Sequence, residues 1–483
     1  MSKYLYGAAV QGIQDFIFKT NELKHIVGAS ELVEEICTHA FDEYAQNGED
    51  VVRAAGNIKF IFNNEEDCKK AVREFPKKVM TMAPGITISQ AVVPIDADFS
   101  KAIDLIEARL KEQRNKPPKS VTLGLTGIKR ANNTGLPVVD VEGRNFLDDA
   151  TLAKQNKVKE ENHDLRGLCS KSFGNFYGKI AYNITDITGK NDWIAIIHAD
   201  GNGLGKVVQT VGKKKDVYKV FSQKLSEATT EAAHQAYKEV SWPFDAREAI
   251  PIRPVVLSGD DMTVIIRGDI ALDYANAFIV AFEKETRKAL GDILRSEHVF
   301  ADDRDHLTAC AGIAFIKSSF PFYYGYELAE VLCGHAKKDT KAINGENSNH
   351  LPPSCLMFHK VQDSFIFDYQ DIVKRELTAY DGLSFKAGPY YIKEQAGKRS
   401  VDDLIANCLL LNTENSDGVK SGIRNWMTLR LGNKDLADQR KERMLQIFAD
   451  TTAVETLTEE ENGTCIVYDV LSYNTIMNQQ TNM

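Results

Sequence analysis

The chain has 483 residues, of which 43% are hydrophobic and 26% charged, and its formal net charge is −9. At about 100–200 residues per domain, this length predicts three or four domains of an ordinary globular protein. The negative charge argues against a broad surface that coats nucleic acid, and without an apolar run of about 18 residues no membrane partner is expected. The scattered cysteines form no Cys-x-x-Cys pair, which argues against a zinc ribbon and favours reduced thiols in a cytoplasmic protein.

The first elements follow the order β-α-β-β-α-β, which is the ferredoxin-like pattern. In order they are a strand over 4–10, a helix from Ala29 to Tyr44, strands Val51–Ala54 and Ile58–Phe62, a helix Glu65–Met82 and a strand Ile86–Val93. The two strands in the middle are joined at Gly56-Asn57. These elements predict one small sheet covered by helices.

The same order returns further along, which indicates two copies of one architecture. The second set comprises strand Ile194–Ile197, a helix from Asp216 to Val240, strands Ile252–Leu257 and Met262–Ile266, a helix from Ile270 to Leu290, strand Leu307–Ile316 and a helix Tyr323–Lys338. After residue 350 helical patterns predominate.

The sequence thus predicts an α+β protein with two ferredoxin-like domains. We expect a first domain over 1–97, a middle linker domain without zinc ligands over 98–185, a second domain over 186–345 and a helical C-terminal domain over 346–483.

Two carboxylates stand side by side in the hairpin of the second copy, where apolar residues run up to Asp260-Asp261 and away again. Asp200 follows the first strand of that copy, and in a ferredoxin-like sheet this strand lies beside the hairpin. The first copy has Gln11-Gly12 and Gly56-Asn57 at the matching turns. We therefore expect the second copy to be catalytic and the first to be degenerate and non-catalytic.

Asp200, Asp260 and Asp261, with the Gly201 carbonyl as an extra ligand, are the predicted catalytic metal ligands. Nucleotidyl transfer needs metal ions that activate the attacking oxygen and neutralise the leaving pyrophosphate, and Mg²⁺ prefers carboxylates, carbonyls and water. The expected cofactor is Mg²⁺, or Mn²⁺. The alternative is that Asp260 and Asp261 only form a turn.

Glycines after Asp200 let backbone N–H groups approach a triphosphate, and nearby lysines add charge. The predicted nucleotide-binding residues are Gly201, Asn202, Gly203, Gly205, Lys206, Ser258, Gly259 and Lys337. Lys337 or Lys338 ends the last helix of the second copy and reaches the phosphates, unless both cap the helix end. His198 orients a carboxylate or a base, or it packs in the sheet.

These residues, in this order, resemble the large polymerase-like (palm, GGDD-type) subunit of type III CRISPR effector complexes, from about residue 4 to 445. The matching segments are Val10-Gln11-Gly12, Asp200-Gly201-Asn202-Gly203-Leu204-Gly205, Gly259-Asp260-Asp261, Ala336-Lys337 and Gly388-Pro389-Tyr390. The resemblance implies two palm domains, the second related to GGDEF cyclases. That palm makes cyclic oligoadenylates from ATP when the complex binds target RNA, with Asp260 and Asp261 holding metals and Asp200 contributing.

The chain departs from that family where Ser258 replaces the first hairpin glycine and Asn202 stands where a second acid is common. No HD nuclease domain precedes the first copy, so we expect a compact form of the subunit.

The predicted function is a metal-dependent nucleotidyltransferase or cyclase that makes cyclic or linear oligonucleotides from ATP or another nucleoside triphosphate, releasing pyrophosphate in CRISPR-type antiviral signalling. The alternatives are a silent nucleotide-binding sensor or scaffold and a phosphodiesterase. An RNA or CRISPR-type complex partner and a homo-oligomer are left open.

Overall fold

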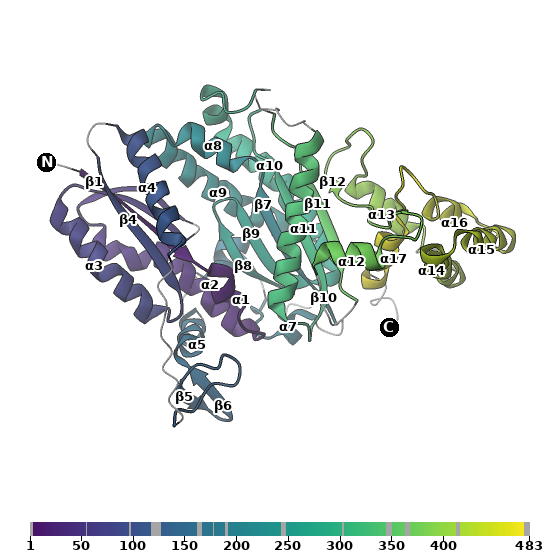
Figure 1. Cartoon of the computed structure of the whole chain (residues 1–483), viewed down its shortest axis with the longest axis horizontal. Coiled ribbons are helices and arrows are strands. Elements are labelled where there is room, and N and C mark those ends of the chain that lie inside the picture. Colours follow the sequence, from purple (N-terminus) through teal and green to yellow (C-terminus); the bar gives the residue numbers. More distant parts are fainter. Residues whose placement is uncertain are drawn as a thin grey trace.

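The computed structural model describes residues 3–54, 56–95, 98–116, 127–161, 167–176, 178–188, 192–242, 248–301, 304–343, 350–362, 368–411 and 416–477. Two mixed units of sheet and helix lie next to each other, and a helical part follows at the far end from the N-terminus (Figure 1). Both units have the strand connections of a ferredoxin-like domain.

The first sheet has the order β2-β3-β1-β4 and is antiparallel throughout. Its elements are β1 (Lys3–Gln11), α1 (Ile13–Phe18), α2 (Leu23–Cys37), the 3₁₀ turn η1 (His39–Tyr44), β2 (Gly48–Ala54), β3 (Asn57–Phe62), α3 (Glu65–Met82), β4 (Thr87–Ile95) and α4 (Phe99–Arg114). Alternate residues of β1 point to opposite faces, so Tyr6 packs with α2 and α3 whereas Leu5 packs with α4. Both faces of this sheet are therefore covered.

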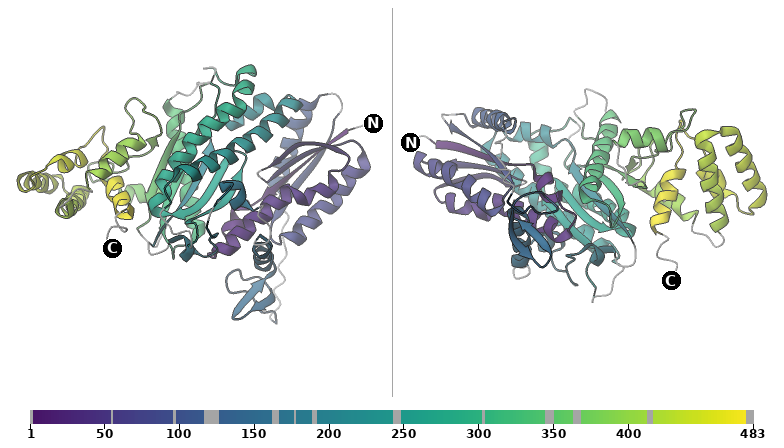
Figure 2. Two further views of the ribbon diagram at one scale, coloured as in Figure 1. Left: turned by 180° about the vertical axis from the view of Figure 1, so that it is seen from behind. Right: turned by 60° about the horizontal axis from the view of Figure 1, so that its bottom comes forward.

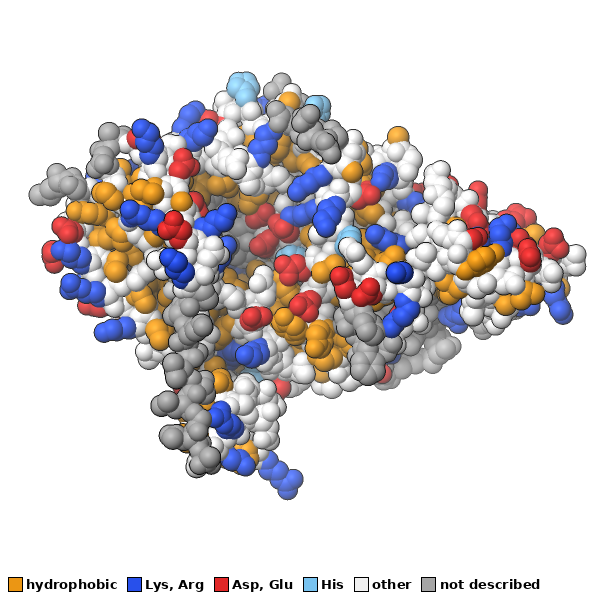
Figure 3. Space-filling model, viewed as in Figure 1, with side chains coloured by type: hydrophobic (Ala, Val, Ile, Leu, Met, Phe, Trp, Pro, Cys, Tyr) orange, Lys and Arg blue, Asp and Glu red, His pale blue; other side chains and the backbone are white. Residues whose placement is uncertain are grey.

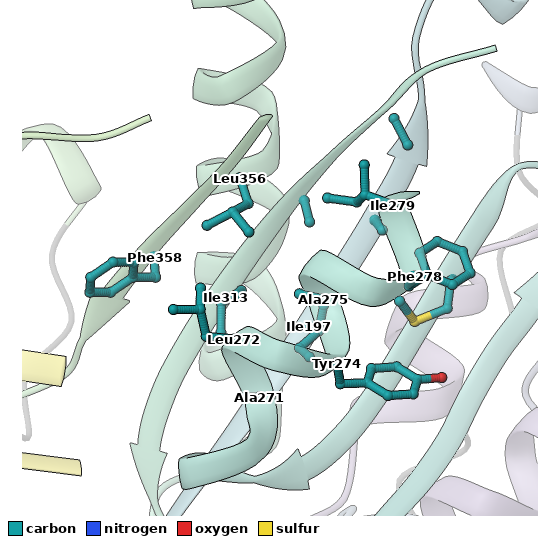
Figure 4. Close-up of a cluster of buried hydrophobic side chains, with 14 of the residues drawn as sticks. Ile197, Ala271, Leu272, Tyr274, Ala275, Phe278, Ile279, Ile313, Leu356 and Phe358 are labelled. Atoms are coloured by element: carbon teal, nitrogen blue, oxygen red, sulfur yellow. The ribbon is translucent and has the colours of Figure 1, made fainter. Parts of the chain in front are cut away.

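The second sheet has the order β12-β11-β10-β7-β9-β8. Its elements are β7 (Trp193–Gly201), α8 (Leu204–Val211), α9 (Lys215–Glu239), β8 (Ile252–Ser258), β9 (Asp261–Arg267), η2 (Gly268–Ile270), α10 (Ala271–Ser296), β10 (Ala309–Lys317), α11 (Phe322–Ile343), β11 (Cys355–Lys360) and β12 (Tyr390–Tyr391). Helix α10 packs on β7 and β10, and its side chains share one buried cluster with Ile197, Ile313 and Leu356 of the sheet (Figure 4). Helix α11 covers the other side.

The middle segment holds β5 (Val138–Glu142), β6 (Asn145–Asp148), α5 (Asp149–Glu161), α6 (Leu168–Phe173) and α7 (Ile184–Thr188). The β5–β6 hairpin projects from the molecule, as two views show (Figures 1 and 2). Helix α5 packs on α2, and α6 packs on α9, so this segment contacts both sheet-bearing units.

The C-terminal part consists of α12 (Tyr369–Glu376), α13 (Val401–Leu409), α14 (Ser416–Gly432), α15 (Lys434–Ile447), α16 (Thr452–Leu457) and α17 (Val467–Met477). The buried side chain of Trp426 lies in its core, and the buried guanidinium of Arg430 pairs with Glu460 and Asp381. A buried arginine needs such partners because an unpaired charge in the interior is costly.

The two sheet-bearing units contact each other through helices and strands on both sides of their interface. The Ser30 hydroxyl on α2 donates to the Val255 carbonyl on β8. The rings of Phe18 on α1 and Tyr326 on α11 stack with their centroids 4.4 Å apart. On the other side, Lys215 of α9 forms an ion pair of 2.6 Å with Glu49 of β2. The first unit thus lies against the edge of the second sheet that carries β8.

The α+β class and both β-α-β-β-α-β orders expected from the sequence are confirmed. Several details differ from the expected elements. The helix expected from Ala29 to Tyr44 is α2, which begins at Leu23 and ends at Cys37, and the separate 3₁₀ turn η1 follows it. Helix α11 continues to Ile343, beyond Lys338, strands β11 and β12 extend the second sheet past residue 345, and α4 adds to the first unit past residue 97. Among the described residues, none of the helices combines the length and the apolar character needed to cross a membrane.

Gly312 on β10 sets how closely α11 approaches the sheet. A Cβ atom at this position would lie 1.9 Å from the Ala329 carbonyl oxygen and 2.5 Å from the Cys333 backbone nitrogen, whereas a Cβ at Gly334 would meet nothing within 4 Å. We predict that Gly312→Ala lowers the melting temperature by roughly 2–12 °C, because overpacking costs about 1–3 kcal/mol. Gly334→Ala, in the facing helix α11, should leave the melting temperature unchanged or raise it. Equal melting curves for the two variants in differential scanning calorimetry would contradict this packing.

Candidate functional site

Asp200 lies near the end of β7, the central strand that pairs with β10 on one side and β9 on the other. The residues before it, Ile194 to Ile197, are fully buried on both faces, which is typical of a strand in the middle of a covered sheet. Asp200 stands opposite Cys310 in this register, and its side chain is 34% exposed. The strand therefore runs from the buried core of the sheet to a partly exposed end, and this end carries the Asp200 carboxylate.

Asp260 and Asp261 lie at the tip of the β8–β9 hairpin. Ser258 pairs with Asp261, and the turn between them is Gly259-Asp260. Gly259 has a φ of 65°, a left-handed conformation that glycine adopts without strain. The hydroxyl of the buried Thr229 on α9 donates to the Gly259 carbonyl over 2.6 Å. The hairpin tip is thereby anchored to the helix behind it.

The structure brings the three predicted acids together: Asp200, Asp260 and Asp261 each offer a carboxylate oxygen, and these atoms lie within 4.8 Å of one another. Gly201 makes this approach feasible, because a Cβ there would lie only 2.7 Å from Oδ2 of Asp260. All three carboxylates are half-buried. Acidic side chains gather in the middle of the face seen in Figure 3.

Crowding of like charges in a partly buried place raises carboxyl pKa values. Burial, followed by the neighbouring Asp200, raises the pKa of Asp260 well above the ordinary aspartate value of about 3.9. Burial, followed by the charges of Asp260 and Asp200, raises the pKa of Asp261 in the same direction. Without a bound metal ion, the cluster therefore holds protons that a free aspartate would lose.

Lys337 on α11 supplies a positive charge at this cluster. Its ammonium forms an ion pair with Asp200 and donates to the Gly201 carbonyl over 2.8 Å. Burial lowers the pKa of Lys337, but the charge and hydrogen bond of Asp200, together with the charges of Cys333 and Asp260, outweigh burial, so the pKa is raised. Because α11 continues to Ile343, Lys337 is not a cap at the helix end, and Lys338 beside it is exposed.

The glycine turn after Asp200 leads into α8. Gly203 has a φ of 72° at the start of this helix, and a Cβ at Gly205 would meet open space. The ammonium of Lys206 lies 6.0 Å from the ring centre of Phe300. Asn202 is directed inward, because its side chain is buried and its Nδ2 donates to Thr308 Oγ1 over 3.1 Å.

His198 packs within the sheet. Its Nδ1 lies 3.1 Å from Thr263 Oγ1, and its ring meets that of Tyr326 edge to face at 5.6 Å. Burial lowers its pKa to about 4, so the ring is neutral near pH 7. The packed alternative described from the sequence is the one that the structure favours.

A cavity of about 110 Å³ opens beside Asp261, between α1 and α2 of the first unit and the hairpin of the second. Ser258, Asp261 and Tyr326 line it from the second unit, and Gln14 and Gly56 line it from the first. The acid-free turn of the first unit and the acidic turn of the second thus border the same space.

The sequence interpretation missed Thr229 and Tyr326. Tyr326, Cys333 and Lys337 share the buried face of α11 at helical spacing, and that periodicity was a usable signal for Tyr326. Thr229 lies in the middle of a long helix, and no local pattern connects it with a turn thirty positions away.

The oxygen atoms gathered here suit a hard divalent cation. Three carboxylates and the Gly201 carbonyl are the ligand types that Mg²⁺ and Mn²⁺ accept. The donor set therefore fits the metal expected from the sequence.

Residues 193–345 match the family model described as Cas10/Cmr2, second palm domain. Among solved structures, the chain is similar to a Csm1-Csm4 cassette in complex with AMPPNP, with a TM-score of 0.60, 13% identity and coverage of 99% of this chain and 70% of that one. A Csm1-Csm4 cassette in complex with cA4 gives the same values. The Csm1-Csm4 subcomplex of the type III-A CRISPR-Csm interference complex gives a TM-score of 0.55 and 13% identity, covering 98% and 70%. No curated protein matches the chain in sequence.

The raised pKa values lead to a test on the metal-free protein. A group whose folded-state pKa exceeds its unfolded value adds stability at low pH and loses it as the pH rises through the folded value. In EDTA, we predict that the melting temperature falls as the pH rises above the ordinary aspartate value. Asp260→Asn with Asp261→Asn should flatten this fall, and Asp104→Asn on exposed α4 should not. Parallel curves for wild type and the double variant in a fluorescence melting series would contradict the shifts.

The resemblance noted in the sequence is confirmed: residues 193–345 match the model of the Cas10/Cmr2 second palm domain, and the chain as a whole shares the fold seen in the Csm1-Csm4 structures.

Proposed function

We propose that this protein is an Mg²⁺- or Mn²⁺-dependent nucleotidyltransferase that joins ATP, or another nucleoside triphosphate, into cyclic or linear oligonucleotides for CRISPR-type antiviral signalling. One observation carries the proposal: the Asp200, Asp260 and Asp261 carboxylates meet within 4.8 Å in a palm domain of the Cas10/Cmr2 kind. The Csm1-Csm4 cassettes that the chain resembles were solved with AMPPNP and with cA4, which supports nucleotides as ligands.

Asp200, Asp260, Asp261 and the Gly201 carbonyl would hold the metal. A divalent ion bound there supplies positive charge that lowers the pKa of an attacking hydroxyl and neutralises the leaving pyrophosphate. The protein contributes mainly by holding the metal-binding carboxylates in position. The anchored turn at Gly259 and the close packing of Asp260 against Gly201 fix the carboxylates before substrate arrives.

In the proposed reaction, the ribose 3′-oxygen of one nucleotide attacks the α-phosphorus of another. The new bond joins that oxygen to the α-phosphorus, and the bond from the α-phosphorus to the oxygen bridging it to the β-phosphorus breaks. Pyrophosphate leaves with the electron pair, and the hydroxyl proton passes to water or to a carboxylate of the cluster. Atoms and charge balance without a further reactant.

The triphosphate would lie along the glycine turn. Gly203 and Gly205 present backbone at the start of α8, and Lys206, Lys337, Ser258 and Gly259 surround the same edge of the sheet. Asn202 instead holds this turn against Thr308, because its backbone N–H donates to the Thr308 carbonyl over 2.7 Å and its Nδ2 donates to Thr308 Oγ1 over 3.1 Å. The positive end of the helix favours the phosphate charge.

The first palm would act as a binding partner and not as a second catalytic centre. Its Gly56 lines the cavity next to Asp261, so the part of a nucleotide that entered this space would touch both palms. The turns at Gln11-Gly12 and Gly56-Asn57 carry no carboxylate. One chain can thus supply both sides of the site, and a homo-oligomer stays an untested prediction.

The similarity to the Csm1-Csm4 structures also supports the proposal of a protein partner. The similar structures are assemblies of Csm1 with Csm4, and one belongs to a type III-A interference complex. We propose that this chain also works within an RNA-guided complex, with a Csm4-like neighbour.

The second candidate is a palm pair that binds nucleotides without turnover. Ser258 in place of the first hairpin glycine and the buried amide of Asn202 in place of a fourth acid favour it. It predicts tight nucleotide binding and no product.

Purified protein incubated with the four nucleoside triphosphates and Mg²⁺ or Mn²⁺ should release pyrophosphate and yield oligonucleotides detectable by mass spectrometry. Asp260→Ala with Asp261→Ala should lower the rate by at least about a hundredfold, because a bound metal provides several kcal/mol of charge stabilisation. EDTA should abolish the reaction.

Asp104→Ala is the matched control, because it removes an exposed carboxylate from α4 of the first palm and should leave the rate unchanged. Undiminished activity of the double variant would remove these acids from the mechanism. Binding of ATP without product, both for the protein alone and with a Csm4-like partner, would favour the second candidate.

A further inference from the structure

The ammonium of Lys337 contacts two of the groups that the proposed metal site needs. It pairs with the Asp200 carboxylate and donates to the Gly201 carbonyl over 2.8 Å. An ammonium donates hydrogen bonds into the oxygen lone pairs that a metal ion would use. Two cations held on one carboxylate and one carbonyl would also repel each other.

The backbone of Lys337 is held in place, so only its side chain can move. Helix α11 is held against β10 by the close approach at Gly312, and the thiol of Cys333, one turn before Lys337, donates to the Cys310 carbonyl over 3.2 Å. The Lys337 side chain is 19% exposed. A long, flexible side chain on a fixed helix can move its charge by several ångströms without moving the backbone.

We propose that Lys337 is a tethered cation that competes with the metal ion for Asp200 and Gly201, and that the phosphates of an incoming nucleotide draw it away as the metal enters. The inference rests on the metal site of the proposed function. It makes the binding of metal and nucleotide cooperative, because each ligand relieves the contact that hinders the other, and this coupling is reciprocal.

A purely structural ion pair makes a different prediction. If Lys337 only stabilised the fold, its removal would lower thermal stability and leave metal affinity unchanged or weaker. Competition predicts the opposite change: removal of Lys337 raises the affinity for the metal ion. The test measures the direction of this change.

The test is a Mn²⁺ titration of the full chain, freed of metal with EDTA and dialysed, in the absence of nucleotide. Free Mn²⁺ is measured by electron paramagnetic resonance. Lys337→Met should bind Mn²⁺ about 5–150-fold more tightly than wild type, the usual range for coupled sites. Lys338→Met, which removes the exposed neighbour, should match wild type, and Lys337→Arg, which keeps the charge, should stay weak. Equal or lower affinity of Lys337→Met would overturn the proposal.

A second measurement needs no variant. Acetic anhydride labels accessible amines, and mass spectrometry gives the labelled fraction of Lys337 relative to Lys338. Addition of Mn²⁺ should raise this ratio in wild-type protein, because the displaced ammonium leaves its carboxylate. An unchanged ratio at saturating Mn²⁺ would overturn the competition even if Lys337→Met failed to fold.

Failure of this inference can be told apart from failure of the proposed function. If Asp260→Asn with Asp261→Asn binds Mn²⁺ as wild type does, the metal site is wrong and both fail. If that variant loses Mn²⁺ while wild type and Lys337→Met bind it equally, the metal site stands and only the role of Lys337 is overturned.

Discussion

Three carboxylates with oxygen atoms within 4.8 Å of one another form the constraint on which this site depends. Such a cluster repels itself unless a proton, a cationic side chain or a metal ion neutralises part of its charge. Two of the acids hold protons more tightly than usual, a lysine ammonium lies on the third, and the oxygen atoms suit a divalent cation. The arrangement costs stability when metal-free, which is common where a protein prepares a site for a ligand.

The surrounding fold keeps the acids together despite this repulsion. Central strand β7 holds Asp200, the hairpin turn is tied to α9 through Thr229, and Gly201 leaves room for Asp260. The packing of α11 at Gly312 brings Lys337 to the same place. Each of these contacts lies in well-packed elements, so the geometry is set by the core of the sheet and not by the loop alone.

Sequence reasoning found the acids because residue type and strand order together limit where Asp200, Asp260 and Asp261 can lie. It also found the doubled β-α-β-β-α-β order, since long periodic segments such as α9 and α10 are strongly patterned. It could not find the length of α11, the inward turn of Asn202 or the anchoring by Thr229. These depend on contacts between residues far apart in the chain, and no local pattern encodes them.

The central claim is that the three acids form a metal site, and anomalous scattering from crystals grown with Mn²⁺ and a non-reactive ATP analogue tests it most directly. The account predicts one or two Mn²⁺ peaks between Asp200, Asp260 and Asp261, with the Lys337 ammonium moved off Asp200 toward the phosphates. Nucleotide density without a Mn²⁺ peak at these acids, or Mn²⁺ bound elsewhere on the chain, would contradict it.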